Sequence, residues 1–164
     1  MITKKVVLIG DFSTGKTSLI RRYVENEFSD EYLTTIGVKI SKKNVLELQL
    51  MIWDIEGRTD VKTINTTYIT GAHGLIVVAD FTRKKTIENI STHIKECMEV
   101  VKNIPIVLAI NKSDLVSEST IDEVLNELKL LFGDIKMIFN TSAKDGRNVE
   151  NIFLNLSKAM VAKR

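Results

Sequence analysis

The residues with the clearest chemical potential form a glycine-rich turn between a short apolar run and an amphipathic segment. Residues 10–17 read Gly-Asp-Phe-Ser-Thr-Gly-Lys-Thr, which fits the P-loop pattern of glycine, four residues, glycine, lysine and threonine. The preceding residues 6–9 are apolar and rich in β-branched side chains, which is typical of a buried strand. The following residues 18–24 place their apolar side chains on one face of a helix.

A turn between a strand and a helix N-terminus binds anions, because free backbone N–H groups and the positive end of the helix dipole converge there. In this pattern the Lys16 ammonium reaches the outer phosphates of a nucleotide and the Thr17 hydroxyl ligates Mg²⁺. A turn can match by chance, but here the strand and helix that the pattern requires are both predicted. The residues expected to hold the phosphates are Asp11, Phe12, Ser13, Thr14, Gly15, Lys16, Thr17 and Ser18.

A second constellation indicates which base the nucleotide carries. Asn111, Lys112 and Asp114 follow the apolar run 104–110, and ligands of open parallel sheets bind at the carboxyl ends of the strands. The Asp114 carboxylate can accept hydrogen bonds from N1–H and the 2-amino group of guanine, a pair of donors that adenine lacks. Alone, this motif is weak and would suit a solvated loop; the upstream P-loop favours guanine recognition. Residues expected to complete the base site are Phe28, packing edge-on against the ring, and Ser142, Ala143 and Lys144, offering a backbone N–H to guanine O6.

A third group of residues lies between these two motifs. Asp54 follows an alternating apolar run from Leu46 to Ile52, whose side chains are expected to share one face of a strand. Asp54 would hold Mg²⁺ directly or through water, and the Gly57 N–H would meet a γ-phosphate. The Thr35 hydroxyl offers a further Mg²⁺ ligand. The expected metal ligands are therefore Thr17, Thr35 and Asp54.

In their order and spacing, these motifs resemble the Ras superfamily of small GTPases, and most closely its Rab branch, over nearly all 164 residues. Residues 71–78, the following Asp80 and Thr82, and the Trp53-Asp54 pair carry the likeness to Rab proteins. The resemblance implies a switch that binds GTP or GDP with Mg²⁺ and meets effector, exchange-factor and activating proteins at its switch regions. It also implies an α/β P-loop NTPase G domain, with a mostly parallel six-stranded sheet flanked by about five helices. The residues that it places at the reacting phosphate are Lys16, Thr35, Gly57 and Arg58.

Several residues depart from the family pattern. Arg58 stands where relatives carry the glutamine that orients the attacking water, and Glu56 stands where they carry alanine. Phe12 replaces a small P-loop residue. These changes leave nucleotide binding intact but argue against rapid hydrolysis. We therefore expect a switch that hydrolyses GTP slowly, with a non-hydrolysing, constitutively GTP-loaded interaction module as the alternative. A P-loop enzyme of another class, such as an ATP-dependent kinase, would need an arginine-rich lid, which the sequence does not show.

Alternating strand and helix patterns predict a mainly parallel sheet covered on both faces, in a single domain spanning residues 1–164. An antiparallel edge strand is expected from a hairpin over residues 38–53. Strands are expected at residues 4–9, 38–42, 45–53, 74–80, 104–110 and 136–139, and helices at 16–25, 61–70, 86–102, 119–132 and 148–162.

Composition argues against several other kinds of site and partner. A net charge of +2 with scattered basic residues argues against nucleic-acid binding. The single cysteine, Cys97, excludes an internal disulfide, suits a reducing compartment and lies at helical spacing among apolar residues, as expected for a small buried hydrophobe. His73 and His93 are far apart and have no companion cysteines, so no zinc site is expected. With no signal peptide, membrane span or cysteine near Arg164 for lipid attachment, we expect a cytoplasmic monomer, membrane-associated only if a C-terminal tail has been removed.

Overall fold

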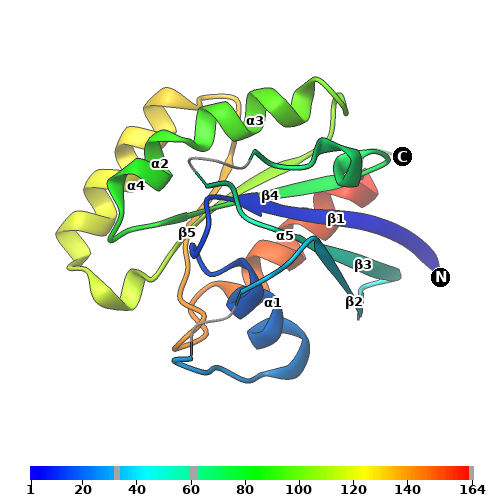
Figure 1. The fold of residues 1–164 in the computed structure, drawn as a ribbon, viewed down its shortest axis with the longest axis horizontal. Helices are drawn as coiled ribbons and strands as arrows, with labels where there is room; N and C mark the ends of the chain where they lie inside the picture. Colours follow the sequence, from blue (N-terminus) through cyan, green and yellow to red (C-terminus); the bar gives the residue numbers. More distant parts are fainter. Residues whose placement is uncertain (32–33, 60–62, 163–164) are drawn as a thin grey trace.

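A six-stranded sheet organises the chain, in the order β2-β3-β1-β4-β5-β6 (Figure 1). The structure is a computed structural model that describes residues 1–31, 34–59 and 63–162. β2 runs antiparallel to β3, and the other neighbouring strands are parallel, which confirms the expected mostly parallel sheet with one antiparallel edge. The strands are β1 (Ile2–Gly10), β2 (Val38–Val45), β3 (Leu48–Ile55), β4 (Gly74–Asp80), β5 (Ile106–Asn111) and β6 (Met137–Asn140).

Helices cover both faces of this sheet, because its central strands are apolar on both sides. Every residue of β4 is buried. Helices α1 (Lys16–Glu25) and α5 (Val149–Ala162) pack on one face, where the rings of Tyr23 and Phe153 stack with centroids 4.0 Å apart. The other face carries α2 (Lys84–Glu88), α3 (Ile90–Met98), α4 (Glu118–Leu131) and the 3₁₀ turn η1 (Thr66–Ile69) (Figure 1). A second 3₁₀ turn, η2 (Ser113–Leu115), follows β5. Within the described ranges, no helix is both long and apolar enough to cross a membrane.

The parallel strands bring four loops to one edge of the sheet. Residues 11–15 follow β1, residues 56–59 follow β3, residues 112–115 follow β5 and residues 141–146 follow β6. Because these strands run in the same direction, their carboxyl ends meet at this edge. All three groups of residues singled out in the sequence therefore converge there.

The hairpin between β2 and β3 differs from the expectation for Leu46. Val45 pairs with Leu48, so Leu46 and Glu47 form a two-residue turn rather than the start of a strand. Leu46 has a φ of 54° and is 55% exposed, whereas Leu48, Leu50 and Ile52 are buried as expected. Short hairpin turns require positive φ angles, and this local demand outweighs the apolar alternation.

The predicted helix at residues 61–70 is wrong over half of its described length, and the remainder is a 3₁₀ turn rather than an α-helix. Residues 61–62 lie outside the described part of the chain, residues 63–65 have no regular structure, and only η1 is helical. This segment is rich in β-branched residues and contains Asn65, all of which are poor helix formers. The Asn65 carboxamide oxygen accepts from the Thr67 N–H at 3.1 Å, which caps the short 3₁₀ turn instead.

The predicted helix at residues 86–102 is divided. It starts two residues earlier as α2, is interrupted at Asn89 and ends at Met98 as α3. The Asn89 side chain makes no capping hydrogen bond to α3; its Nδ2 instead donates to the Asp11 carboxylate at 2.8 Å. The Asn89 side chain, at the break between α2 and α3, is therefore used for a contact with Asp11 and not for capping a helix.

Cys97 lies in α3 and is fully buried, as expected. Burial, with a smaller effect of Glu96, raises the pKa of its thiol to about 12. Because only the thiolate is nucleophilic, we expect Cys97 to resist iodoacetamide in the folded protein and to react after unfolding in urea. Mass spectrometry of the modified protein measures this. Labelling of the folded protein as fast as that of the unfolded chain would contradict the burial of this thiol.

Candidate functional site

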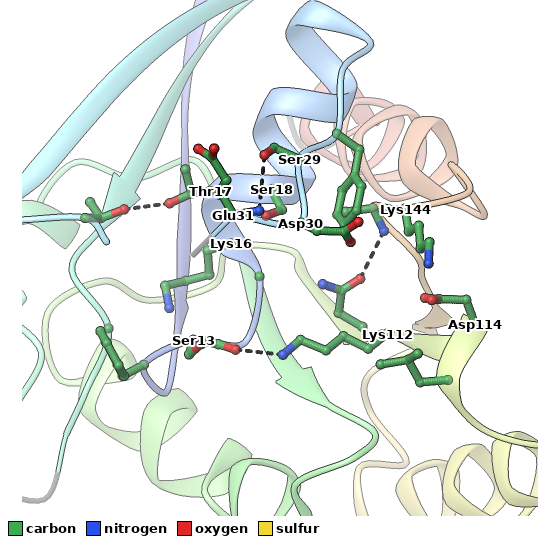
Figure 2. Close-up of a pocket in the computed structure, with 18 residues that line it drawn as sticks. Ser13, Lys16, Thr17, Ser18, Ser29, Asp30, Glu31, Lys112, Asp114 and Lys144 are labelled. Carbon is green, nitrogen blue, oxygen red and sulfur yellow. Dashed lines mark hydrogen bonds between the residues drawn. The ribbon is translucent and has the colours of Figure 1, made fainter. Parts of the chain in front are cut away.

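A cavity of about 300 Å³ opens at the carboxyl edge of the sheet (Figure 2). Figure 2 shows Lys16 and Thr17 at one end, and Asp114 and Lys144 at the other. Most residues singled out in the sequence line this cavity: Phe12, Ser13, Gly15, Lys16, Thr17, Ser18, Phe28, Thr35, Gly57, Asn111, Lys112, Asp114, Ala143 and Lys144. The predicted site residues that do not line the cavity each form a hydrogen bond with a residue that does; they are Asp11, Thr14, Asp54, Arg58 and Ser142.

The P-loop has the backbone conformation of an anion-binding turn. Ser13 and Gly15 have φ angles of 64° and 99°, so two residues of the loop before α1 have a left-handed backbone conformation. No side chain caps the start of α1, which leaves N–H groups of its first turn for a ligand. A Cβ on Gly15 would lie 2.2 Å from Nδ2 of Asn111, so only glycine fits between the loop and β5.

The Lys16 ammonium lies inside the curve of this loop. Its Nζ donates to the carbonyl oxygens of Asp11 at 3.0 Å and Gly10 at 3.4 Å. Burial lowers the pKa of Lys16 to about 8, although Asp54 and Asp11 act in the opposite direction. Gly57 lies against the same ammonium: a Cβ at this position would be 2.9 Å from Lys16 Nζ. The backbone after β3 therefore approaches the loop as closely as glycine allows.

Three oxygen-bearing side chains meet beside the loop. Thr17 Oγ1 donates to Asp54 Oδ2 at 2.6 Å and lies 2.5 Å from Thr35 Oγ1, which is itself 3.3 Å from Asp54 Oδ2. Burial raises the pKa of Asp54, although hydrogen bonds from Thr17 and Thr35 and the charge of Lys16 act in the opposite direction. Asp54 Oδ1 is buried without a hydrogen-bond partner among the described residues. Hydroxyl and carboxylate oxygens with an unsatisfied acceptor are a donor set that fits Mg²⁺.

Asn111 ties together the loops at the other end of the cavity. Its Nδ2 donates to the Thr14 carbonyl at 3.0 Å, and its Oδ1 accepts from the Thr141 hydroxyl at 3.1 Å. The same Oδ1 accepts from the Ala143 N–H at 3.3 Å. The Ala143 N–H, one of the groups expected to face guanine O6, therefore already donates to a side chain of the protein.

Asp114 and Lys112 project from the same loop. Asp114 Oδ1 accepts from the Ser142 hydroxyl at 2.8 Å, so Ser142 orients a carboxylate that lines the cavity. Lys112 has a φ of 66°, and its Nζ contacts the Ser13 carbonyl at 3.1 Å and Asp80 Oδ2 at 2.8 Å. The lysine side chain thus crosses from the loop that carries Asp114 to the P-loop.

Arg58 points away from the cavity. Its guanidinium forms an ion pair with Glu96 of α3 at 3.0 Å. Its backbone pairs with the P-loop: Phe12 N donates to Arg58 O at 2.8 Å, and Arg58 N donates to Gly10 O at 3.1 Å. The main chain of Arg58 therefore lies against the P-loop, whereas its guanidinium is paired with α3.

Sequence reasoning missed several residues that support the site. Arg22 of α1 donates from Nε to the Ala143 carbonyl at 2.8 Å and from Nη2 to the Lys144 carbonyl, which links α1 to the loop after β6. Arg83 Nη1 donates to the Phe12 carbonyl at 2.8 Å. Asn89 and His93 bind the Asp11 carboxylate, as detailed below. In sequence, none of these side chains differs from an ordinary surface or core residue.

The single tryptophan lies where the sheet meets η1. Trp53 pairs with Ile40 across β2 and β3, and its ring centroid is 6.4 Å from that of Tyr68. Lys5 Nζ lies 3.6 Å from the centroid of the Trp53 ring, within cation–π distance. Trp53 therefore packs between the sheet and the segment that follows Gly57 and Arg58.

Comparisons with known proteins agree with this arrangement. The family model described as "Ras family" matches residues 5–162. Rab-1A of Dictyostelium discoideum is 35% identical over 93% of this chain and 78% of its own length. The GTP-binding protein ypt1 of Schizosaccharomyces pombe is 34% identical over 94% of this chain and 78% of its own length. Rab-13 of the dog is 34% identical over 97% of this chain and 80% of its own length. The chain therefore belongs to the Ras family of small GTPases and is a Rab-like member of it.

Proposed function

We propose that residues 1–164 form a single G domain that binds GTP and GDP with Mg²⁺ and hydrolyses GTP slowly. The observation that carries this proposal is the cavity itself, which has a P-loop with its lysine at one end and an aspartate fixed by Ser142 at the other. Such a cavity suits a ligand with phosphates at one end and a hydrogen-bonding base at the other.

Each part of the cavity has a proposed role. The Lys16 ammonium and the N–H groups at the start of α1 would bind the β- and γ-phosphates, and the Gly57 N–H would meet the γ-phosphate. Thr17, Thr35 and Asp54 would hold Mg²⁺, which supplies charge neutralisation at the phosphates when it is bound. In hydrolysis, a water oxygen bonds to the γ-phosphorus while the bond from that phosphorus to the β–γ bridging oxygen breaks, giving GDP and phosphate.

The base end supports guanine over adenine. The Ser142 hydroxyl fixes Asp114 Oδ1 at 2.8 Å, which orients the carboxylate for a ligand that donates two parallel hydrogen bonds. Phe28 lines the cavity and packs partly against the core, so its ring is held where it would contact the base. Asn111 and Arg22 connect this end to the P-loop and α1, so that base and phosphates would be recognised by one connected framework.

The two segments that contact the γ-phosphate are proposed to form the switch. Thr35 and Gly57 would bind the triphosphate together and separate when the γ-phosphate leaves. Exposed apolar residues lie close to Thr35: Ile36 is 84% exposed and Ile40 is 44% exposed. These residues favour this face for effector, exchange-factor and activating proteins.

The position of Arg58 bears on the rate of hydrolysis. The ion pair with Glu96 keeps the guanidinium out of the cavity lining, so it does not replace a glutamine that orients water. Guanidinium also has no hydrogen-bond acceptor, so it cannot accept from an attacking water as an amide oxygen can. The same contact favours the alternative of a GTP-loaded module that does not hydrolyse. The rate constant for single-turnover GTP hydrolysis separates the two: slow conversion supports the switch, and GTP that remains intact supports the module.

We expect Asp114→Asn to lower GDP affinity and to favour xanthosine diphosphate. A hydrogen bond to a charged group contributes about 1.5–3 kcal/mol, which corresponds to a loss of roughly ten- to 150-fold in affinity. Isothermal titration calorimetry with GDP, ADP and xanthosine diphosphate measures the preference. Asp122→Asn, on the exposed side of α4, is the matched control and should bind GDP like the wild type. Equal affinities of the wild type for GDP and ADP would refute the role of Asp114.

Thr35→Ala should weaken binding of a non-hydrolysable GTP analogue and leave GDP binding nearly unchanged, because Thr35 is proposed to contact the metal only in the triphosphate state. Thr17→Ala should weaken both, because Thr17 is proposed to contact the metal in both states. Thr34→Ala changes the exposed neighbouring threonine and is the control. Titrations in the presence of Mg²⁺ measure all four proteins. Equal losses for the GTP analogue and GDP in Thr35→Ala would disprove this division of roles.

Arg58→Gln should hydrolyse GTP faster than the wild type, whereas Arg58→Ala should stay close to it, because the guanidinium is held on α3. Glu96→Gln removes the same ion pair but keeps the arginine, and it tests whether loss of the ion pair alone changes the rate of hydrolysis. Single-turnover assays with preloaded GTP measure the rate constants. A tenfold or larger slowing in Arg58→Ala, or about 1.4 kcal/mol in the barrier, would show that the arginine is catalytic and that this assignment is wrong.

A further inference from the structure

A carboxylate lies within the loop proposed to bind phosphates. Asp11 is the second residue of the P-loop, is 6% exposed, and its backbone carbonyl accepts from Lys16 Nζ and from Thr14 Oγ1, each at 3.0 Å. A negative charge at this position would repel the phosphates of a nucleotide unless its field is countered. The Asp11 side chain therefore needs compensating partners.

Those partners come from α3 and the residue that precedes it. His93 Nε2 lies 2.8 Å from Asp11 Oδ1, and Asn89 Nδ2 lies 2.8 Å from Asp11 Oδ2. Burial alone raises the pKa of the Asp11 carboxyl, but hydrogen bonds from His93 and Asn89, together with the charges of His93 and Arg83, hold that pKa below its ordinary value. An ionised carboxylate only accepts hydrogen bonds, so Nε2 of His93 carries the proton in this contact.

Among the described residues, the imidazole of His93 makes this one hydrogen bond and is otherwise enclosed. His93 is 0% exposed, and its Nδ1 is buried without a hydrogen-bond partner among the described residues. A leucine would fill such a site as a core residue does, so the polar ring is explained by Asp11 rather than by packing. Asn89 supports the same conclusion, because its side chain binds Asp11 instead of capping α3.

We propose that His93 and Asn89 are positioning residues of the nucleotide site: they provide hydrogen bonds that hold the Asp11 carboxylate in place, and thereby keep the P-loop and Lys16 ready to accept phosphate. This inference rests on the proposed nucleotide binding and deepens it. Without these donors, the Asp11 carboxylate turns toward water to recover its hydrogen bonds. The loop moves with it, because the Asp11 carbonyl is also the acceptor for Lys16.

The test compares GDP affinity in variants of the full chain, by titration with a fluorescent GDP analogue in the presence of Mg²⁺. His93→Leu should bind GDP about tenfold more weakly or worse, whereas His93→Gln, which keeps a donor, should lie closer to the wild type. The decisive variant is His93→Leu combined with Asp11→Asn, which removes the charge that histidine compensates. Its affinity should return to within about threefold of the wild type.

Cys97→Ala is the matched control for packing. Cys97 is also fully buried in α3, one turn after His93, and the described hydrogen bonds of the Asp11 side chain come from His93 and Asn89 instead. Its substitution should lower the melting temperature and leave GDP affinity unchanged. If His93→Leu does not fold, Asn89→Ala with and without Asp11→Asn gives the same comparison, with the same expected loss and recovery.

Two results would overturn the inference. One is a His93→Leu protein that binds GDP as tightly as the wild type. The other is a double variant that binds as weakly as His93→Leu alone, which would show that the histidine acts through packing and not through Asp11. A wild-type protein that does not bind GDP at all would instead refute the proposed function, so the two failures are distinguishable.

Discussion

The close approach of two backbones at the ends of β1 and β3 is the constraint on which the site depends. Arg58 pairs through its main chain with Gly10 and Phe12, and a Cβ on Gly57 would lie 2.6 Å from the Cα of Phe12. This contact fixes where the P-loop curves and where the segment after β3 begins. The Lys16 ammonium, the Thr17 hydroxyl and the Asp54 carboxylate all take their positions from these two strands. A side chain at residue 57 would push the two backbones apart, so this contact requires glycine there.

Around this contact, polar side chains reach between elements that are distant in sequence. Asn111 connects β5 to the P-loop and to the loop after β6, and Arg22 connects α1 to that same loop. Asn89 and His93 connect α3 to Asp11. Each of these contacts is buried or partly buried and uses donors and acceptors that would otherwise be costly to leave unpaired. Hydrogen bonds from side chains in and around the cavity wall thus connect the loops that form it.

Local sequence patterns predicted the strands and most of the cavity lining, whereas Ser29, Asp30, Glu31 and Leu115 of the lining were not predicted. The apolar runs of β1 and β4 and the spacing of Gly10, Gly15 and Lys16 are visible without tertiary information. The strand prediction at Leu46 was wrong because the hairpin turn requires a positive φ there. The helix prediction at residues 63–65 was wrong because these residues have weak helix propensity. Asn89, His93 and Arg22 could not be assigned at all. Their roles arise from partners 78, 82 and 121 residues away in sequence, and nothing in the local sequence distinguishes a histidine that binds a carboxylate from one that fills a core.

The packing of Trp53 has an optical consequence. The chain contains one tryptophan, and its indole lies under the Lys5 ammonium at 3.6 Å and beside the Tyr68 ring of η1. Indole emission responds to nearby charge and to the polarity of its surroundings, and η1 belongs to the segment that follows Gly57. Rearrangement of that segment changes the surroundings of the sole indole fluorophore. The protein thus carries an intrinsic spectroscopic probe of the position of η1, readable without attaching a dye.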